Sequence, residues 1–236
     1  MSSTVLRYGL LVILMVAGFA RAESDRGRDP FSFSNNTRYL ALGDSLAAGF
    51  GALPATRGYA YLLYLKGVYD KEINTSFANA AVPGATSSDV LTYQVPQAIG
   101  IFRPHVITIS VGGNDLLKIL RGADPVQVLT EFQGNLTQIL CGLRQALPQT
   151  RVYVHNLYDI PEITEAIPGG LQAILQFNLI VAGVGQACGA GVADVFSAFS
   201  GQHGLLIIDR RGHEPLEVHP TNAGYRVIAD AFEAVR

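Results

Sequence analysis

Four residues whose types suit nucleophilic catalysis stand at separate places in the sequence. Ser45 follows the short apolar run 39–42 and a glycine, Gly84 follows a proline, Asn114 follows two glycines, and His219 precedes a proline. A serine hydroxyl becomes a nucleophile when a histidine accepts its proton. Backbone N–H groups and side-chain amides stabilise the oxyanion that forms during acyl transfer. Together these residue types could supply the nucleophile, the base and the oxyanion site of acyl transfer.

Each of these residues also has an ordinary structural interpretation when taken alone. Ser45 can cap a helix after a strand, and Gly84 can serve a tight turn. Asn114 can begin an Asx turn, and Asp115 fits a cap of the next helix. A lone histidine such as His219 is more often structural than catalytic. The catalytic interpretation therefore depends on the fold bringing the four residues to one place.

The elements expected around these residues alternate between strands and helices. Continuous apolar or β-branched runs predict strands at 39–42, 76–81, 105–111, 151–157 and 192–196. Helical patterns occur at 60–69, from Ser87 or Ser88 onward, at 125–147 after Asp124 as N-cap, at 170–188 and at 222–235. Such alternation predicts a parallel sheet with helices on both faces. The carboxyl edge of such a sheet gathers functional residues, and the four candidates all fit that edge.

The first 22 residues have the features of a secretory signal peptide. Arg7 precedes an apolar run at 10–20, and a small-x-small cleavage signature follows at 20–22. The run is well short of the roughly 20 residues that span a bilayer. We expect residues 1–22 to be removed, 23–36 to form a flexible arm and 37–236 to fold as one domain. This predicts a secreted or periplasmic protein with no integral membrane segment after cleavage; an uncleaved anchor is the alternative.

Charge and composition exclude several classes of protein. The formal net charge is −2, and without Arg7 and Arg21 it becomes 15 minus 19, or −4. A mildly acidic chain without a Lys/Arg run has no electrostatic footprint for nucleic acid. Hydrophobic residues make up 49% and charged residues 15%, which excludes a disordered chain. Cys141 and Cys188 predict a disulfide in an oxidising compartment, with two buried free thiols as the alternative.

The four candidate residues lie in sequence blocks that resemble those of the GDSL/SGNH hydrolase family. Gly-Asp-Ser-Leu at 43–46, Gly84, Gly-Gly-Asn-Asp at 112–115 and His-Pro at 219–220 match in order, within a resemblance that covers 39–235. The resemblance implies a flavodoxin-like three-layer α/β/α fold with a five-stranded parallel sheet. It also implies ester hydrolysis through an acyl-enzyme, without a metal or an organic cofactor.

The resemblance also implies a role for each matched residue. By this match Ser45 is the nucleophile and His219 is the base. The N–H groups of Ser45 and Gly84 and the side-chain amide of Asn114 form the oxyanion hole.

The sequence departs from the family pattern beside the histidine. The family usually carries Asp three residues before it, where this chain has Leu216. The third triad member orients the imidazole and stabilises its charged form. The Leu216 carbonyl could take this role, or Glu217, which shares a face with His219 if the segment is extended. Glu214 ranks behind both.

Two rival families of hydrolase fit the sequence poorly. The α/β-hydrolase elbow reads G-x-S-x-G, and this chain has Ala47 in place of the second glycine. A metallohydrolase would need a ligand motif such as H-E-x-x-H, which is absent from the sequence. A binding module that kept the fold and lost turnover is a rival of a different class, supported by the departure at Leu216 alone.

The resemblance leaves the substrate open. A plain carboxylic ester hydrolase is the first expectation, and an esterase that removes acetyl groups from extracellular polysaccharide is the alternative. The side chains that could form an aromatic platform for a sugar are Phe50, Tyr59, Tyr61 and Tyr158. The loop 157–161 is expected to line the acyl or the alcohol side. We therefore expect a monomer that takes a small-molecule, lipid or glycan ester.

Overall fold

The computed structural model describes residues 37–67, 76–165, 167–207 and 218–236. The expected signal peptide at 1–22, the expected arm at 23–36 and the candidate residues Glu214, Leu216 and Glu217 lie outside these ranges. The elements below are therefore those of the described part of the chain.

Five parallel strands form the centre of the fold. They are β1 (Arg38–Gly43), β2 (Ser76–Asn79), β3 (Val106–Ser110), β4 (Arg151–His155) and β5 (Gly191–Ala193), in the order β2-β1-β3-β4-β5. Neighbouring strands are parallel at each pairing. The side chains of β1 and β3 are almost all buried, because both strands are covered on both faces. Most of them are apolar, and the polar Thr108 and Ser110 of β3 are buried as well.

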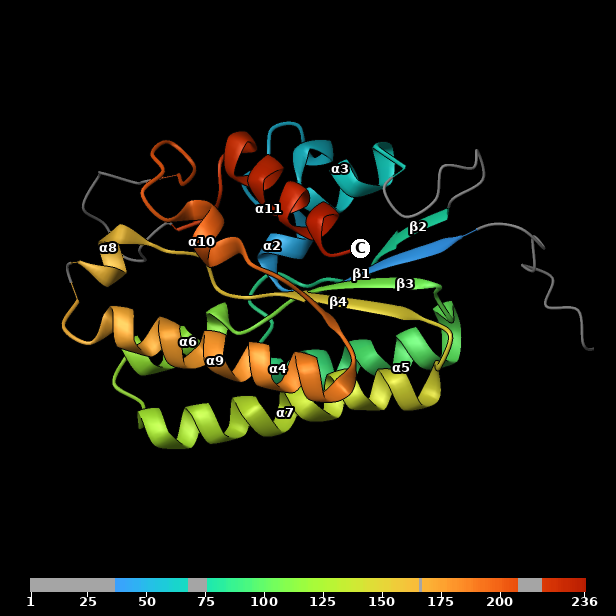
Figure 1. The fold of residues 1–236 in the computed structure, drawn as a ribbon, viewed down its shortest axis with the longest axis horizontal. Coiled ribbons are helices and arrows are strands. Elements are labelled where there is room, and N and C mark those ends of the chain that lie inside the picture. Colours follow the sequence, from blue (N-terminus) through green and yellow to red (C-terminus); the bar gives the residue numbers. More distant parts are fainter. Residues whose placement is uncertain (1–36, 68–75, 166, 208–217) are drawn as a thin grey trace, which may run out of the picture. The chain divides into compact units, whose positions relative to one another are not determined.

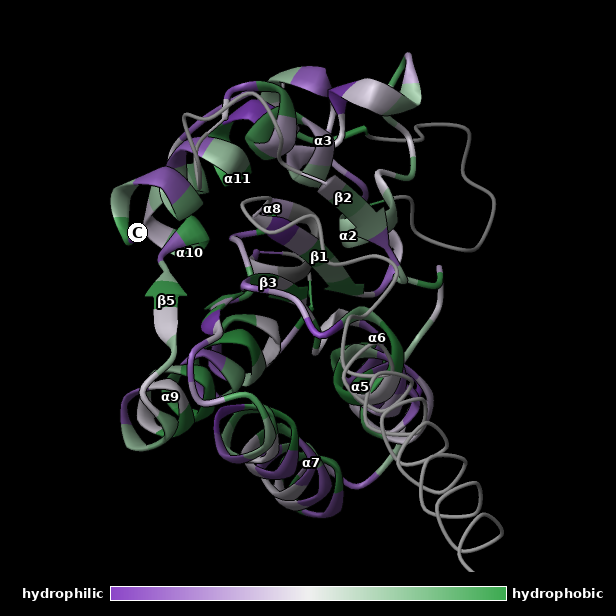
Figure 2. Cartoon of the chain, turned by 90° about the vertical axis from the view of Figure 1, so that its right-hand side faces the viewer, coloured by the Kyte–Doolittle hydropathy of each residue, from purple (hydrophilic) through white to green (hydrophobic). Residues whose placement is uncertain are grey.

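Helices cover both faces of this sheet (Figure 1). One layer holds α2 (Ser45–Ala48), α3 (Tyr59–Leu65), α10 (Val195–Phe199) and α11 (Asn222–Ala234). The other holds α6 (Gly113–Leu120), α7 (Pro125–Ala146), α9 (Gly170–Cys188) and a helical run from 87 to 102. Two short pieces complete the order: η1 (Ala55–Arg57) lies between α2 and α3, and α8 (Pro161–Thr164) lies between β4 and α9. The turned view in Figure 2 shows the same separation of α3 and α11 from α5 and α7. The predicted three-layer α/β/α fold with a five-stranded parallel sheet is confirmed.

The long helices carry the packing of the second layer. The side chains of Phe132 on α7 and Phe177 on α9 meet with ring centroids 4.7 Å apart. α9 is the single helix among the described residues that is long and apolar enough to cross a membrane. It instead packs against α7, β4 and β5, so its apolar face serves the core. The predicted disulfide joins Cys141 on α7 to Cys188 on α9, with Cα atoms 4.8 Å apart.

The fifth strand is shorter than the sequence predicted. The run 192–196 is continuous in its apolar character, but β5 ends at Ala193 and α10 begins at Val195. Asp194 separates the two elements, because its carboxylate accepts a hydrogen bond from the Ser197 N–H and caps the new helix. The prediction of a strand through Phe196 was wrong for this reason.

The helical run after the second strand begins with a different cap from the one expected. Thr86 is the N-cap of α4 (Ser87–Asp89), and its hydroxyl and the Asp89 carboxylate form a reciprocal capping box. The run continues as η2 (Val90–Gln94), α5 (Val95–Gln97) and η3 (Ala98–Phe102), with two π-helical segments. Neither Ser87 nor Ser88 is the cap.

Candidate active site

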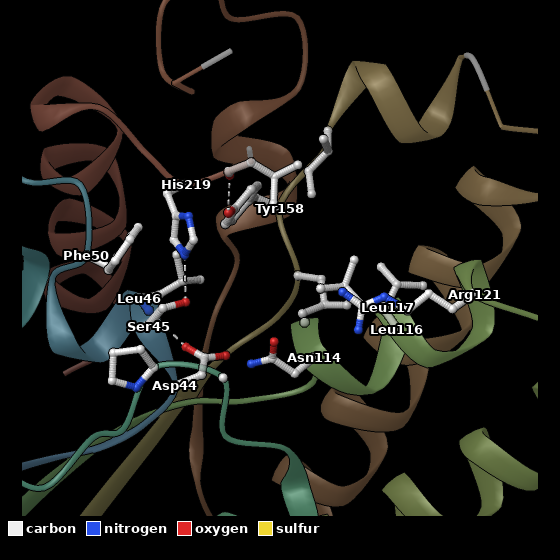
Figure 3. A pocket seen from close by; sticks show the side chains of 16 residues that line it. Asp44, Ser45, Leu46, Phe50, Asn114, Leu116, Leu117, Arg121, Tyr158 and His219 are labelled. Carbon is white, nitrogen blue, oxygen red and sulfur yellow. Dashed lines mark hydrogen bonds between the residues drawn. The ribbon is translucent and has the colours of Figure 1, made fainter. Parts of the chain in front are cut away.

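Ser45 and His219 meet at the carboxyl edge of the sheet. Ser45 is the first residue of α2 and is separated from the end of β1 by Asp44 alone, and His219 lies just before α11. Their Oγ and Nε2 atoms are 2.8 Å apart, as the dashed line in Figure 3 shows. The two residues are 174 positions apart in sequence, so the fold creates the pair. A hydroxyl at this distance can give its proton to the imidazole.

The turn that presents Ser45 is held by a close approach of two strands. Gly43 ends β1 with φ +126°, and a Cβ at this position would collide with the Ser110 carbonyl of β3. The Asp44 N–H donates to that same carbonyl at 3.1 Å. Only glycine therefore lets the chain leave the sheet here and place Ser45 at the edge.

The Gln94 side chain also holds the Gly43 turn, in addition to the contact with Ser110. No sequence pattern indicated this residue. Its side-chain carbonyl accepts from the Gly43 N–H at 2.7 Å, and its amide donates to the Gly43 carbonyl at 2.8 Å. Gln94 is 2% exposed, so both bonds are shielded from water. A glutamine inside a helical run has no local pattern that would single it out.

Asp44 is a buried carboxyl behind the serine. It caps α2 by accepting from the Leu46 N–H at 3.0 Å, and it accepts from the Ser110 Oγ at 2.7 Å. Burial raises the pKa of Asp44 to about 6, while the hydrogen bonds from Ser110 and Leu46 and the nearby His219 oppose this rise. The helix cap is therefore Asp44 rather than Ser45, which leaves the serine hydroxyl available to His219.

Ser45, Gly84 and Asn114, the three residues expected to form the oxyanion hole, line one pocket. The backbone N–H groups of Ser45 and Gly84 are the groups of interest. Neither N–H takes part in a hydrogen bond among the described residues. Gly84 has φ +85°, a conformation that glycine adopts readily. The Asn114 Nδ2 donates one hydrogen bond to the Ala85 carbonyl at 2.9 Å, which fixes the amide and leaves its second N–H for a ligand.

Asp115 has a structural role other than the expected one. α6 begins at Gly113 after Gly112, so Asp115 lies inside the first turn and does not cap the helix. Its carboxylate accepts from the backbone N–H and the hydroxyl of Ser87, both at 2.9 Å. This pair ties the start of α6 to the start of α4, and thereby holds Asn114 beside the Gly84 turn.

The imidazole of His219 is held through its neighbours. The Phe50 ring lies against it, with centroids 4.5 Å apart. The Tyr158 hydroxyl donates to the Val218 carbonyl at 2.8 Å, and the Ile207 N–H donates to the His219 carbonyl at 2.7 Å. These contacts fix the loop on both sides of the histidine. The candidates for orienting it, at 214, 216 and 217, lie outside the described residues.

A pocket of about 350 Å³ opens in front of Ser45. Its wall is mainly apolar, and Figure 3 shows the serine and histidine on one side with Leu116, Leu117 and Arg121 on the other. The loop expected to line the site contributes Leu157, Tyr158 and Ile160. The remaining apolar lining residues are Leu46, Phe50, Pro83 and Val218.

The four aromatic residues considered for a sugar platform do not lie together. Tyr59 is fully buried and stacks on Phe232 in the core. Tyr61 packs against Phe77 and does not line the pocket. Phe50 and Tyr158 do line it. The pocket wall therefore has two of these four rings.

Comparison with known proteins shows the family and the fold of the chain. The model of the GDSL-like lipase/acylhydrolase family matches residues 41–227. No curated protein sequence matches. The lipase Lip_vut3 from a goat rumen metagenome is 25% identical, with a TM-score of 0.65 over 84% of this chain and 97% of that one.

Two further solved structures share the fold at lower identity. Phospholipase A1 from Streptomyces albidoflavus is 20% identical, with a TM-score of 0.64 over 85% of this chain and 99% of that one. A variant of an acetyl-xylooligosaccharide esterase from Geobacillus is 21% identical, with a TM-score of 0.64 over 83% and 92% of the two chains. The family match spans both the Ser45 turn and His219, and on this evidence the chain belongs to the GDSL-like lipase/acylhydrolase family.

Proposed function

We propose that this protein is a secreted serine hydrolase that cleaves carboxylic esters through an acyl-enzyme on Ser45. The observation that carries the proposal is the 2.8 Å contact between Ser45 Oγ and His219 Nε2 at the mouth of an apolar pocket. In the first step Oγ attacks the ester carbonyl while Nε2 accepts its proton. The imidazolium then protonates the departing alcohol, which leaves the acyl group on Ser45. In the second stage water attacks the acyl carbonyl while Nε2 accepts its proton, and the imidazolium returns a proton to Ser45 Oγ as the acid is released.

The oxyanion forms where three donors converge. The N–H groups of Ser45 and Gly84 and the second N–H of the Asn114 amide serve as this oxyanion hole. Their support is that all three residues line one pocket and that the Gly84 and Ser45 N–H groups are not engaged by any described residue. Donors fixed in advance stabilise the developing charge without reorganisation, which is the largest single contribution in many hydrolases.

The group that orients His219 is the Leu216 carbonyl or the Glu217 carboxylate, with Glu214 behind them. A carbonyl would give a Ser–His dyad, whereas a glutamate would complete a triad. Glu217→Gln separates the two. An unchanged kcat excludes Glu217 and favours the backbone carbonyl over Glu214, which Glu214→Gln then tests. A fall of several orders of magnitude assigns the role to Glu217. The contacts of Phe50 and Tyr158 hold the histidine loop in either case.

The substrate is a small-molecule or lipid ester with a short to medium acyl chain. Support comes from the apolar wall and the pocket volume of about 350 Å³, which is at the small end for ligand sites. A carbohydrate acetyl esterase is the second candidate, favoured by the Phe50 and Tyr158 rings at the pocket. A binding module without turnover is the alternative of a different class.

We further propose that residues 1–22 are a signal peptide, 23–36 an arm, and 37–236 the hydrolase domain of a monomer. The apolar run of the leader and the Cys141–Cys188 disulfide support an extracellular or periplasmic location.

Hydrolysis of p-nitrophenyl esters from C2 to C12 tests the function. The mature protein, secreted by an expression host from the full chain, is compared with its Ser45→Ala variant. The proposal expects turnover in the native protein and its loss in a variant with an unchanged circular dichroism spectrum. A maximum at C2 would favour the acetyl esterase, and a maximum at C4 to C8 the plain ester hydrolase. No turnover of any ester by the folded native protein would favour the binding module.

A further inference from the structure

Arg121 lies in the pocket wall on the side away from the Ser45–His219 pair (Figure 3). It directly follows α6, the helix whose first turn carries Asn114. Among the described residues that line the pocket, it is the only Lys or Arg. The wall that leads to it from Asn114 is formed by Leu116 and Leu117. An apolar surface with one cation at its far end is therefore a feature of this site.

The charge of Arg121 is not engaged by the described residues. Lys118, one turn earlier on α6, forms an ion pair with Asp115 at 3.7 Å. The Arg121 guanidinium has no ion pair or hydrogen bond with any residue in the described ranges. It is exposed, so its donors remain free for a solute. Arginine presents a planar fork of donors that matches a carboxylate in two parallel hydrogen bonds.

The proposed mechanism decides which part of an ester reaches Arg121. The departing alcohol must lie beside His219, because Nε2 protonates it. The carbonyl oxygen lies at Gly84 and Asn114. The acyl substituent therefore extends away from His219, along Leu116 and Leu117 toward Arg121 (Figure 3).

Helix α6 also sets the distance between Asn114 and Arg121. Seven residues of helical rise separate Asn114 from Arg121, or about 10 Å, and helical side chains lean back toward the N-terminus. The guanidinium can therefore meet a group a few carbons along the acyl chain.

We propose that Arg121 selects esters whose acyl chain ends in an anionic group, such as monoesters of dicarboxylic acids. The inference rests on the proposed ester hydrolysis at Ser45 and adds a specificity-determining residue to it. Leu116 and Leu117 contact the methylene chain, and Arg121 binds the terminal carboxylate. Specificity of this kind is measured as the ratio of the kcat/KM values for substrates of similar length and different charge.

Three p-nitrophenyl esters of similar length provide the test: the adipate monoester, which is anionic, the heptanoate, which is neutral, and the 6-aminohexanoate, which is cationic. The mature protein is compared with Arg121→Gln, Arg121→Glu and the control Arg226→Gln. Arg226 is exposed on α11 and does not line the pocket, so the control removes the same charge elsewhere.

We expect the ratio of kcat/KM for the adipate to that for the heptanoate to fall roughly two- to fivefold in Arg121→Gln, the range for an exposed charge pair. The ratio stays unchanged in Arg226→Gln. In Arg121→Glu the preference passes to the 6-aminohexanoate, an outcome that damage to the fold would not produce. High salt weakens the preference of the native protein, because exposed charges are screened.

Two results would overturn the inference. Either the native protein does not prefer the adipate over the heptanoate, or Arg121→Gln and Arg121→Glu keep the native ratios. The second result would mean that the Arg121 stem merely covers the pocket wall while its charge lies in solvent. Turnover of the neutral heptanoate by the native protein separates both results from a failure of the proposed hydrolysis, which would abolish turnover of all three esters.

Discussion

The side-chain amide of Gln94 forms two hydrogen bonds with the backbone of Gly43, at 2.7 and 2.8 Å, two residues before Ser45. Gly43 cannot carry a side chain, because a Cβ would meet the Ser110 carbonyl. The peptide before the candidate nucleophile is therefore held between β3 on one side and the buried amide of Gln94 on the other. This contact holds the Gly43 turn, from which the chain continues through Asp44 to Ser45.

Gln94→Leu should lower kcat by roughly 10- to 100-fold with little change in KM, because a small displacement of a reacting group carries a cost of this size. The Gly43 carbonyl keeps its bond from the Val82 N–H, so one buried N–H alone loses its partner. Gln97→Leu is the matched control, since Gln97 is exposed on the same helical run and bonds only to the Tyr93 carbonyl. Equal kcat values in the two variants, from steady-state kinetics on a p-nitrophenyl ester, would contradict a positioning role.

Asn114→Ala should lower kcat by about 10²–10³, the usual cost of one lost oxyanion donor. KM should change little, because the donor acts mainly on the transition state. The variant also loses the bond to the Ala85 carbonyl, so thermal unfolding is measured beside the kinetics. Full activity in a folded Asn114→Ala protein would remove Asn114 from the oxyanion hole.

His155 gives the folding stability a dependence on pH. Burial lowers the pKa of His155 from 6.5 to about 4, and its Nε2 has no hydrogen-bond partner among the described residues. Between these values the unfolded state binds the proton and the folded state does not, so stability rises with pH. The contribution is complete above about pH 6.5 and is lost as the pH falls toward 4. It amounts to about 3 kcal/mol over this window.

Asp44 acts in the opposite direction, since burial raises its pKa to about 6 and the folded state keeps its proton longer. The two effects oppose each other in the native protein, so His155→Phe isolates the first. Urea unfolding at pH 4.5 and pH 7 measures the free energy of unfolding of both proteins. The value for the native protein minus the value for His155→Phe should be larger at pH 7 than at pH 4.5. An equal difference at both pH values would contradict the conclusion that His155 is buried in its neutral form.

The disulfide should stabilise the fold without affecting the site. The bond closes a separation of 47 residues between α7 and α9, worth about 4 kcal/mol in the chain-entropy model, and engineered cases often give less. Replacing both Cys141 and Cys188 by Ser should lower the free energy of unfolding by about 2–4 kcal/mol. Neither residue lines the pocket, so kcat at 25 °C should stay unchanged. A reductant added to the double variant should cause no further loss.

The strands and long helices could be predicted because their sequence patterns are local. The β-branched run that became β3 and the Asp124-Pro125 start of α7 are such patterns. The end of β5 could not be predicted, because Val195 and Phe196 suit a strand as well as a helix and the carboxylate of Asp194 decides between them.

The candidate site also contains residues that could be predicted from the sequence and one that could not. Ser45, Gly84, Asn114 and His219 could be selected because each follows a strand or lies in a loop with a recognisable block, and the structure brings all four to one pocket. Gln94 could not be selected, because its partner is a backbone group 51 residues away. Contacts between residues so far apart in the sequence cannot be predicted from local composition.

Covalent labelling tests the central claim most directly, namely that Ser45 is the nucleophile activated by His219. The mature protein is treated with a p-nitrophenyl alkylphosphonate, which traps a serine nucleophile as a stable ester, and the label is located by peptide mass spectrometry. The account predicts one label per chain on Ser45, loss of esterase activity in proportion to labelling, and strongly slowed labelling in His219→Ala. A label on another residue, or full inhibition with Ser45 unmodified, would contradict it.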